Sequence, residues 1–333
     1  MSDGFHSPES LKRLSVDILT RNRTSTPNAE SVAEALVAAQ IDGHAGHGLS
    51  RLPSYAAQAL SGKVKGFAEP VADRAGAAAV RIDAGYGFAF PALDLARREL
   101  RRIVPDTGIA AATIHRSHHF GAAGRHVELL AEDGLIGLVL GNSPKAIAPW
   151  GGTKGIFGTN PIAFAAPMGP MQPPLLIDLS LSKVARGKIM VAAKNDEPIP
   201  EGWALDADGE PTTDAGAALN GTMIPMGDAK GAALVLMVEI LAAALTGANF
   251  GYEASSFFTA DGDPPGVGQT LIALDPVALS GGAFQDRLSA LVQTILDQEG
   301  ARLPGTRRLK NRAEAAREGI RVPDTLMAEL NAL

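Results

Sequence analysis

The chain has no cysteine among its 333 residues, and it has only two Trp and three Tyr. The absence of cysteine excludes disulfides, thiolate nucleophiles and cysteine-ligated metals, and it is typical of a reducing compartment. The most apolar stretch, residues 231–247, contains Glu239 and is shorter than the roughly 20 residues that a membrane-spanning helix requires. We therefore expect a buried helix there, in a core or a subunit interface, and no membrane segment.

Charge and motif content exclude other classes of protein. The net charge is −6, and basic residues are mixed with acidic ones except near the C-terminus, so no nucleic-acid partner is expected. No segment reads Gly-x-Gly-x-x-Gly between a strand and a helix, and no Gly-x-x-x-x-Gly-Lys-Ser/Thr motif occurs, so no Rossmann fingerprint holds a nicotinamide cofactor. The first residues include neither a basic nor an apolar signal region, which predicts a cytoplasmic protein.

Apolar periodicity predicts an α/β fold. With 46% hydrophobic residues, the chain can form a sizeable core. Helical spacing, short apolar runs and their alternation give the expected elements. The expected helices are 8–21, 26–42, 52–60, 90–103, 124–132, 231–247 and 283–298, with a charged helical region from 311. The expected strands are 78–82, 108–114, 135–140, 162–166, 175–179 and one near 271–274.

One histidine-containing stretch carries the clearest chemical signal. Residues 40–51 read Gln-Ile-Asp-Gly-His-Ala-Gly-His-Gly-Leu-Ser-Arg. The imidazole of His47 can exchange a proton near neutral pH, and Arg51 can hold a carboxylate with two parallel hydrogen bonds. A preceding helix would favour protonated imidazole through its dipole. A glycine-rich helix end would give the same pattern without chemistry, so both interpretations stay open at this point.

Further segments place polar side chains beside predicted strands and helices. The run 115–121, His-Arg-Ser-His-His-Phe-Gly, opens a predicted helix, which favours phosphate binding by main-chain N–H groups. A metal site there is disfavoured, because neighbouring strand residues point to opposite faces and no Cys completes a ligand set. The segments 141–161, 178–188, 225–231 and 302–308 have turn formers or charges that surface loops would also show.

Taken together, these segments resemble the malate/lactate dehydrogenase-like oxidoreductases that lack a Rossmann fold. Five motifs occur in the family's order: Gly-His-x-x-His-Gly, Ser-His-His-Phe-Gly, Gly-Thr-Asn-Pro, Pro-x-Gly-x-x-Lys-Gly and Arg-Leu-Pro-Gly-x-Arg-Arg. The resemblance implies that His47 is the proton donor and that no metal is bound. It assigns the substrate to Arg51, Thr159, Arg186 and Gly187. It assigns the cofactor to Ser117, His118, His119, Phe120, Gly121, Asp178, Leu179, Ser180, Lys230, Arg302, Leu303, Pro304, Gly305, Thr306, Arg307 and Arg308.

The resemblance also implies an architecture and an assembly. The fold would be the family's own α/β fold, with a helical domain built from both chain ends, residues 1–75 and 283–333. This domain would pack on a cofactor-binding sheet domain, residues 76–282. The family implies a homodimer whose active sites draw on both subunits.

The choice of substrate and cofactor follows from finer similarity. Ala-Gly-His-Gly-Leu-Ser-Arg is most similar to the branch that includes (R)-3-sulfolactate dehydrogenase, which predicts reversible reduction of a 2-oxo acid such as sulfopyruvate, oxaloacetate or pyruvate. The arginines of 302–308 favour NADPH, with NADH as the alternative because Asp228 would suit a free ribose.

Two alternative functions stay open. The branch that reduces cyclic imino acids such as Δ1-pyrroline-2-carboxylate has Ser in place of Gly46 and Asp in place of Lys188, so this chain departs from it twice. The other is a non-catalytic dimer that binds an anionic metabolite, since Ala45 and Gly46 replace the common Asp-Ser.

Overall fold

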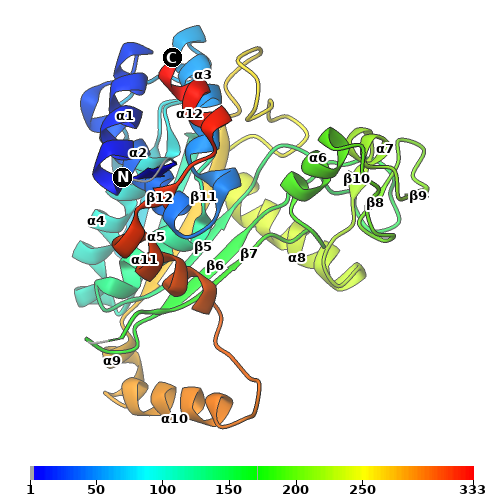
Figure 1. Cartoon of the computed structure of the whole chain (residues 1–333). Coiled ribbons are helices and arrows are strands. Elements are labelled where there is room, and N and C mark those ends of the chain that lie inside the picture. The colour runs from blue at the N-terminus through cyan, green and yellow to red at the C-terminus, as the bar shows by residue number, and fades with distance from the viewer. Residues whose placement is uncertain (1–3, 171) are drawn as a thin grey trace.

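A seven-stranded mixed sheet forms the centre of the protein in the computed structural model, which describes residues 4–170 and 172–333 (Figure 1). Its strand order is β2-β3-β4-β11-β5-β6-β7. The strands are β2 (Val71–Gly76), β3 (Ala79–Asp83), β4 (Ile109–Ser117), β5 (Ile136–Gly141), β6 (Ile162–Ala166), β7 (Leu175–Leu179) and β11 (Val267–Leu274). Only β3 and β4 pair in parallel, and the other five pairs are antiparallel.

Helices cover both faces of this sheet. Helices α4 (Ala89–Thr107) and α5 (Ala123–Glu132) share a core with one face, to which Leu271 contributes. Helix α8 (Ala229–Glu239) and its π-helical continuation η3 (Ile240–Ala244) cover the other face, where the Thr270 hydroxyl donates to a main-chain carbonyl of η3. A Cβ atom at Gly268 would lie 2.0 Å from the carbonyl oxygen of Ala242, so glycine is required for this close packing.

The two ends of the chain meet in a second core beside the sheet. Helices α1 (Pro8–Arg21), α2 (Thr26–Ile41) and α3 (Leu52–Ser61) pack with β12 (Ile320–Arg321) and α12 (Asp324–Asn331). Strand β1 (Phe5–His6) pairs antiparallel with β12, and α11 (Thr306–Glu318) contacts α2. Helices α9 (Pro276–Ser280) and α10 (Phe284–Leu296) lie at the opposite end of the molecule (Figure 1).

A small lobe projects from the body of the molecule (Figure 1). It contains α6 (Arg186–Lys194), α7 (Ala215–Asn220) and a three-stranded sheet with the order β10-β8-β9. These strands are β8 (Ala204–Leu205), β9 (Pro211–Thr212) and β10 (Thr222–Met223). The sequence pattern predicted none of these elements, because each is too short to show a helical or strand periodicity.

The expected buried helix at 231–247 is buried on one side only. Val235 and Val238 are fully buried, whereas Leu236 is 47% and Ile240 is 50% exposed. The helix therefore presents an uncovered apolar side, and a subunit interface on that side stays a prediction. No helix in the described part of the chain is both long and apolar enough to cross a membrane.

Candidate active site

The turn between α2 and α3 presents the predicted proton donor and the predicted carboxylate anchor. Two short 3-10 turns, η1 (Ala45–His47) and η2 (Leu49–Arg51), lead directly into α3. Gly48 packs on the preceding helix so closely that a Cβ atom would lie 2.5 Å from the side-chain oxygen of Gln40. His47 and Arg51 therefore lie at the start of α3, held by a turn that requires glycine.

A chain of hydrogen bonds extends inward from His47. Its Nδ1 lies 3.2 Å from Nε2 of His119, and the two rings stack with centroids 5.2 Å apart. The Nδ1 of His119 lies 2.5 Å from the hydroxyl of Tyr55, which is fully buried on α3. The structure thus brings together His47 and His119, two residues predicted from separate segments, and adds Tyr55, which the sequence motifs did not indicate.

The protonation states give this chain a direction. Burial raises the pKa of Tyr55, so its hydroxyl keeps its proton, and we assign this hydroxyl as the donor to Nδ1 of His119. Burial also lowers the pKa of His119 well below its ordinary value, so the neutral ring donates from Nε2 to Nδ1 of His47. We assign the His47 proton on this basis to Nε2, the ring nitrogen left for a substrate.

The expectation that a helix dipole favours protonated His47 is wrong. Burial, the positive charge of Arg51 and then His44 lower the pKa of His47 to about 4. Helix α2 ends at Ile41, so His47 lies beyond the last helical turn, where the dipole effect fades. Desolvation therefore outweighs the dipole, and the ring is neutral at pH 7 in the free protein.

Arg51 keeps one edge of its guanidinium free for a ligand. Its Nε donates to the carbonyl of Gly46 at 2.7 Å, and its Cζ lies 4.3 Å from the ring centroid of Phe258. Its buried Nη1 has no hydrogen-bond partner among the described residues. A buried donor without a partner is costly, and a carboxylate would satisfy it.

Two further side chains complete the wall around the imidazoles. The ring of Phe257 lies 5.3 Å from that of His118 and 5.2 Å from that of His119. Nε2 of His118 lies 2.8 Å from the side-chain oxygen of Gln58. The only sequence signal for Gln58 and Tyr55 was their helical spacing on the face of Arg51, and nothing in the sequence pointed to Phe257 or Phe258.

The predicted cofactor loop ends β4 and leads into α5. Phe120 fills the space beside Gly141, where a Cβ atom would meet its ring at 2.5 Å. Ser117 is buried, and its hydroxyl has no partner within the described ranges. Among residues 4–170 and 172–333, no group of three His, Asp or Glu side chains is arranged to hold a metal ion.

Asp178 joins this loop to the end of β7. Its Oδ2 accepts a hydrogen bond from the main-chain N–H of Gly124 at 2.7 Å, at the start of α5. Leu179 is exposed, and the hydroxyl of Ser180 contacts that of Ser182 at 2.8 Å. The predicted cofactor segments 117–121 and 178–180 therefore meet at the N-terminus of one helix, where main-chain N–H groups favour anions.

The basic run 302–308 lies beside β7. Gly305 is close to the carbonyl of Leu176, since an added Cβ atom would lie 3.7 Å from it. Arg302 and Arg307 are exposed and form no ion pair within the described part of the chain. Leu303 is half-buried, and Pro304 and Thr306 are exposed.

Arg308 differs from the other two arginines of this run. It is 5% exposed, and its Nη1 lies 3.2 Å from a carboxylate oxygen of Glu128. Arg312 bridges Glu128 and Asp42 with hydrogen bonds of 2.6 to 2.7 Å. Arg308 therefore belongs to a buried ionic cluster, and Arg302 and Arg307 are the freer cations.

The Gly-Thr-Asn-Pro turn is fixed by a buried polar network. The main-chain N–H of Thr159 donates to the hydroxyl of Ser143 at 3.1 Å. Nδ2 of Asn160 donates to Glu239 at 2.7 Å, and Glu239 also accepts from the main-chain N–H of Gly251. The charged residue that interrupts the apolar stretch 231–247 therefore anchors this turn, a role that the sequence pattern did not indicate.

The remaining predicted residues lie on other elements. Arg186 begins α6 on the projecting lobe and donates to the carbonyl of Leu219 at 3.3 Å. Gly187 and Lys188 follow it and are exposed. Lys230 is exposed in the first turn of α8. Within the described part of this single chain, no hydrogen bond or ion pair joins Arg186 or Lys230 to His47 or Arg51.

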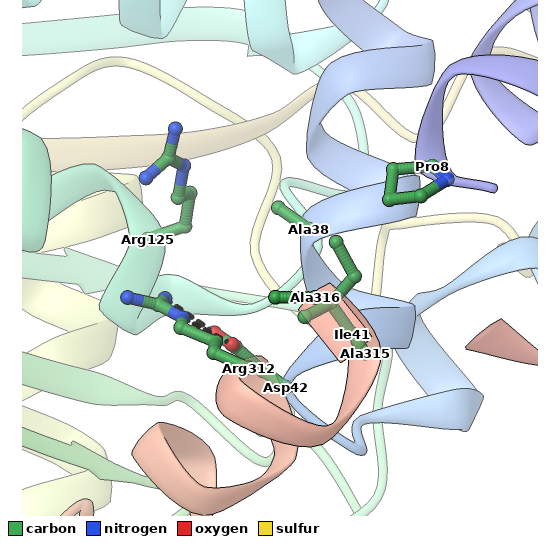
Figure 2. Close-up of a pocket in the computed structure, with 8 residues that line it drawn as sticks. All are labelled: Pro8, Ala38, Ile41, Asp42, Arg125, Arg312, Ala315 and Ala316. Carbon is green, nitrogen blue, oxygen red and sulfur yellow. Dashed lines mark hydrogen bonds and ion pairs between the residues drawn. The ribbon is translucent and has the colours of Figure 1, made fainter. Parts of the chain in front are cut away.

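A cavity of about 250 Å³ lies behind the ionic cluster (Figure 2). Figure 2 shows Arg312 and Asp42 paired at its edge, below the apolar side chains of α2 and α11. Its walls come from Pro8, Ala38, Ile41, Asp42, Arg125, Arg312, Ala315 and Ala316. None of the predicted site residues lines it, so the candidate site is the cluster around His47 and Arg51.

Comparison with known proteins identifies the family of this chain. The family model described as malate/L-lactate dehydrogenase matches residues 6–331. A (2R)-3-sulfolactate dehydrogenase (NADP(+)) from Chromohalobacter salexigens is 52% identical over 91% of this chain and 90% of its own length. A Δ1-pyrroline-2-carboxylate/Δ1-piperideine-2-carboxylate reductase from Pseudomonas putida is 40% identical over 97% of this chain and 95% of its own.

A solved structure gives the same result. The crystal structure of Δ1-piperideine-2-carboxylate reductase from Pseudomonas syringae pv. tomato superposes with a TM-score of 0.92, at 40% identity, over 98% of both chains. The match of the family model to nearly the whole chain, together with these relatives, confirms the resemblance found in the sequence. The chain belongs to the malate/L-lactate dehydrogenase family.

Proposed function

We propose that this protein is an NADPH-dependent oxidoreductase that reversibly reduces a small 2-oxo acid of the sulfopyruvate type to the 2-hydroxy acid. The observation that carries this proposal is the hydrogen-bonded chain from Tyr55 through His119 to His47, beside an Arg51 guanidinium with an unpartnered Nη1. A proton donor and a carboxylate anchor are the two groups that reduction of a 2-oxo acid requires beside the hydride source.

The mechanism follows from these positions. Arg51 binds the C1 carboxylate through its free edge, which places the C2 carbonyl beside His47. The carboxylate offsets the positive charge of Arg51, one of the causes of the low pKa of His47, so acid binding raises that pKa. His47 then protonates the alkoxide oxygen through Nε2, a step typically worth about 10² to 10⁴ in rate.

In the protonated state the internal chain reverses. Nδ1 of His47 then carries a proton and donates to Nε2 of His119. This requires the other tautomer of His119, in which Nε2 has released its proton to solvent and Nδ1 has gained one from solvent and donates to the hydroxyl oxygen of Tyr55. The chain as assigned in the free protein therefore favours neutral His47, and protonation of His47 requires His119 to change its tautomer.

The cofactor of this proposal is NADPH, as the name of the sulfolactate relative supports. The cofactor would be held by Ser117–Gly121, Asp178–Ser180, Lys230 and residues 302–308. The unpartnered Ser117 hydroxyl and the exposed Arg302 and Arg307 fit a phosphorylated dinucleotide. When bound, the nicotinamide supplies the hydride. The residues described here orient the acid and supply the proton.

Two features favour an oxo acid over a cyclic imine. The sulfolactate dehydrogenase relative is 52% identical, whereas the imine reductase relatives are 37 to 40% identical. Gly46 and Lys188 stand where the imine-reducing branch has Ser and Asp, and Arg186 or Lys188 would suit a second negative charge on the substrate. Reduction of Δ1-pyrroline-2-carboxylate is the second candidate, and the names of those relatives support it.

The proposed assembly is a homodimer with shared active sites. Arg186 and Gly187 lie on the projecting lobe, and apolar side chains are uncovered on α6 and α8, including Val191 at 58% and Leu236 at 47% exposure. A partner subunit would cover these side chains and receive Arg186 at its own active site.

The proposed domain organisation is the one that the family resemblance implies. A helical domain comprises residues 1–75 and 283–333, and a sheet domain, residues 76–282, binds the cofactor in the family's non-Rossmann mode.

The test is cofactor oxidation at 340 nm with purified protein. NADPH and NADH are each assayed with sulfopyruvate, oxaloacetate, pyruvate and Δ1-pyrroline-2-carboxylate. We expect the highest kcat/KM with sulfopyruvate and NADPH. Turnover of the imine alone would refute the substrate proposal, and light scattering of the same sample would show whether the active species is a dimer.

A further inference from the structure

Residues 249–266, which form most of the loop between η3 and β11, are fastened by side chains of α3 and of the turn that follows it. Lys63 is only 3% exposed, and its ammonium donates to three main-chain carbonyls of this loop. The side chains of Gln58 and Ser61 each donate to one more. The five acceptors are the carbonyls of Ser256, Phe257, Thr259, Ala260 and Asp261, at 2.8 to 3.0 Å.

The beginning of the loop is fixed as well. The main-chain N–H of Gly251 donates to the buried carboxylate of Glu239 at 2.7 Å. A Cβ atom at Gly251 would lie 2.9 Å from three main-chain atoms of the neighbouring segments. The loop is therefore held near its beginning and in its middle by buried charged groups, and it forms a wall of the site.

This wall presents Phe257 to the imidazoles and Phe258 to Arg51. The ring of Phe258 lies 4.3 Å from Cζ of Arg51 and stays 48% exposed. Arg51 is the N-cap residue of α3, and Lys63 follows the end of this helix, so α3 connects the guanidinium to the residue that holds the loop. Stacking on an aromatic ring and the Nε bond to Gly46 together fix the plane of the guanidinium. Its free Nη1 edge is then already oriented for a carboxylate.

We propose that Phe258 and Lys63 are positioning residues of the acid-binding site: Phe258 fixes the plane of Arg51, and Lys63 holds Phe258 in place. The proposal deepens the proposed function and rests on the binding of the substrate carboxylate by Arg51. Neither residue needs to touch the reacting atoms. Loss of Phe258 weakens acid binding and leaves cofactor binding unchanged, because the contacts of the wall with the predicted cofactor residues His118 and His119 are made by Phe257 and Gln58.

The first test is the substitution Phe258→Ala in the full-length protein. A cation–π contact at a partly desolvated site predicts an increase in KM for the preferred acid of about tenfold, with kcat changed by less than about threefold. The dissociation constant of NADPH, from fluorescence titration, stays unchanged. Phe258→Tyr retains the stacking and restores KM, and Phe67→Ala, at a ring that is 65% exposed elsewhere, is the matched control.

A double-mutant cycle separates positioning from general damage. Lysine at position 51 keeps the charge but loses the planar group, so Phe258→Ala adds less than about twofold to KM in an Arg51→Lys background. Lys63→Met raises KM as Phe258→Ala does. If Lys63→Met fails to fold, as its melting curve would show, the Phe258 series carries the test alone.

The outcomes distinguish this inference from the proposed function. An unchanged KM in Phe258→Ala, with a raised KM in Arg51→Lys, would overturn the positioning role and leave the function intact. An unchanged KM in Arg51→Lys would overturn the binding of the carboxylate by Arg51, and with it the proposed function. Full additivity of the two substitutions would show that Phe258 does not act through Arg51.

Discussion

Substitution of Tyr55 by Phe tests the direction of the internal hydrogen-bond chain. The change removes one hydroxyl from a fully buried ring and leaves the packing with Phe88 and Phe90 in place. In the native protein this hydroxyl donates to His119, and the donation passes to Nδ1 of His47. That direction opposes a protonated His47, whose Nδ1–H would face another donor.

We expect Tyr55→Phe to lower the stability of the protein and to raise the pKa of His47. Loss of the hydroxyl leaves a buried nitrogen of His119 unpaired, which should lower the free energy of unfolding by about 1 to 3 kcal/mol. His119 is then free to accept a proton from Nδ1 of His47, so the pKa of His47 should rise from about 4. Burial and Arg51 still act on the ring, so the pKa stays below the ordinary value of 6.5.

The assay is a pH titration of labelled histidine by NMR, for the native protein and for Tyr55→Phe without substrate. Urea unfolding of both proteins gives the change in stability. Tyr86→Phe, at a tyrosine outside the site, is the control. A lower or unchanged pKa of His47 in Tyr55→Phe would refute the assigned direction of the chain, whatever happens to the stability.

Four further predictions follow from the site and its supports. His47→Ala should lower turnover at least about a hundredfold and leave NADPH affinity unchanged in a fluorescence titration, and full activity would remove His47 from the mechanism. Arg302→Ala combined with Arg307→Ala should weaken NADPH binding about tenfold or more and NADH binding far less, whereas equal losses would contradict a contact with the 2′-phosphate. Glu239→Gln places an amide N–H₂ among donors and should lower the free energy of unfolding by about 1 to 3 kcal/mol in urea. The free energy of unfolding should also fall as the pH drops below 6.5. The histidines of the unfolded chain become protonated there, whereas in the folded protein burial holds the pKa of His47 at about 4 and that of His118 at about 3. A urea midpoint that is equal at pH 5 and pH 7 would contradict this.

The local sequence was sufficient to predict many helices and strands and to identify the family. Helix α1 and strand β6 have the predicted bounds, because each has a regular apolar pattern bounded by turn or capping residues. The motifs placed His47 and Arg51 in one turn, since both belong to a stretch of twelve residues with its own helix end. The strand order was not accessible in this way: β11, from late in the chain, inserts between β4 and β5.

Only the tertiary structure decided what surrounds these two residues. His119 reaches His47 across 72 residues of sequence, and the loop carbonyls reach Gln58 and Lys63 across 193 to 199. The pKa of His47 depends on this burial, which is why the helix-dipole expectation had the wrong sign. A local pattern shows which side chains can exchange a proton or hold an anion, but burial and long-range partners set their charge, their direction and the edge that stays free.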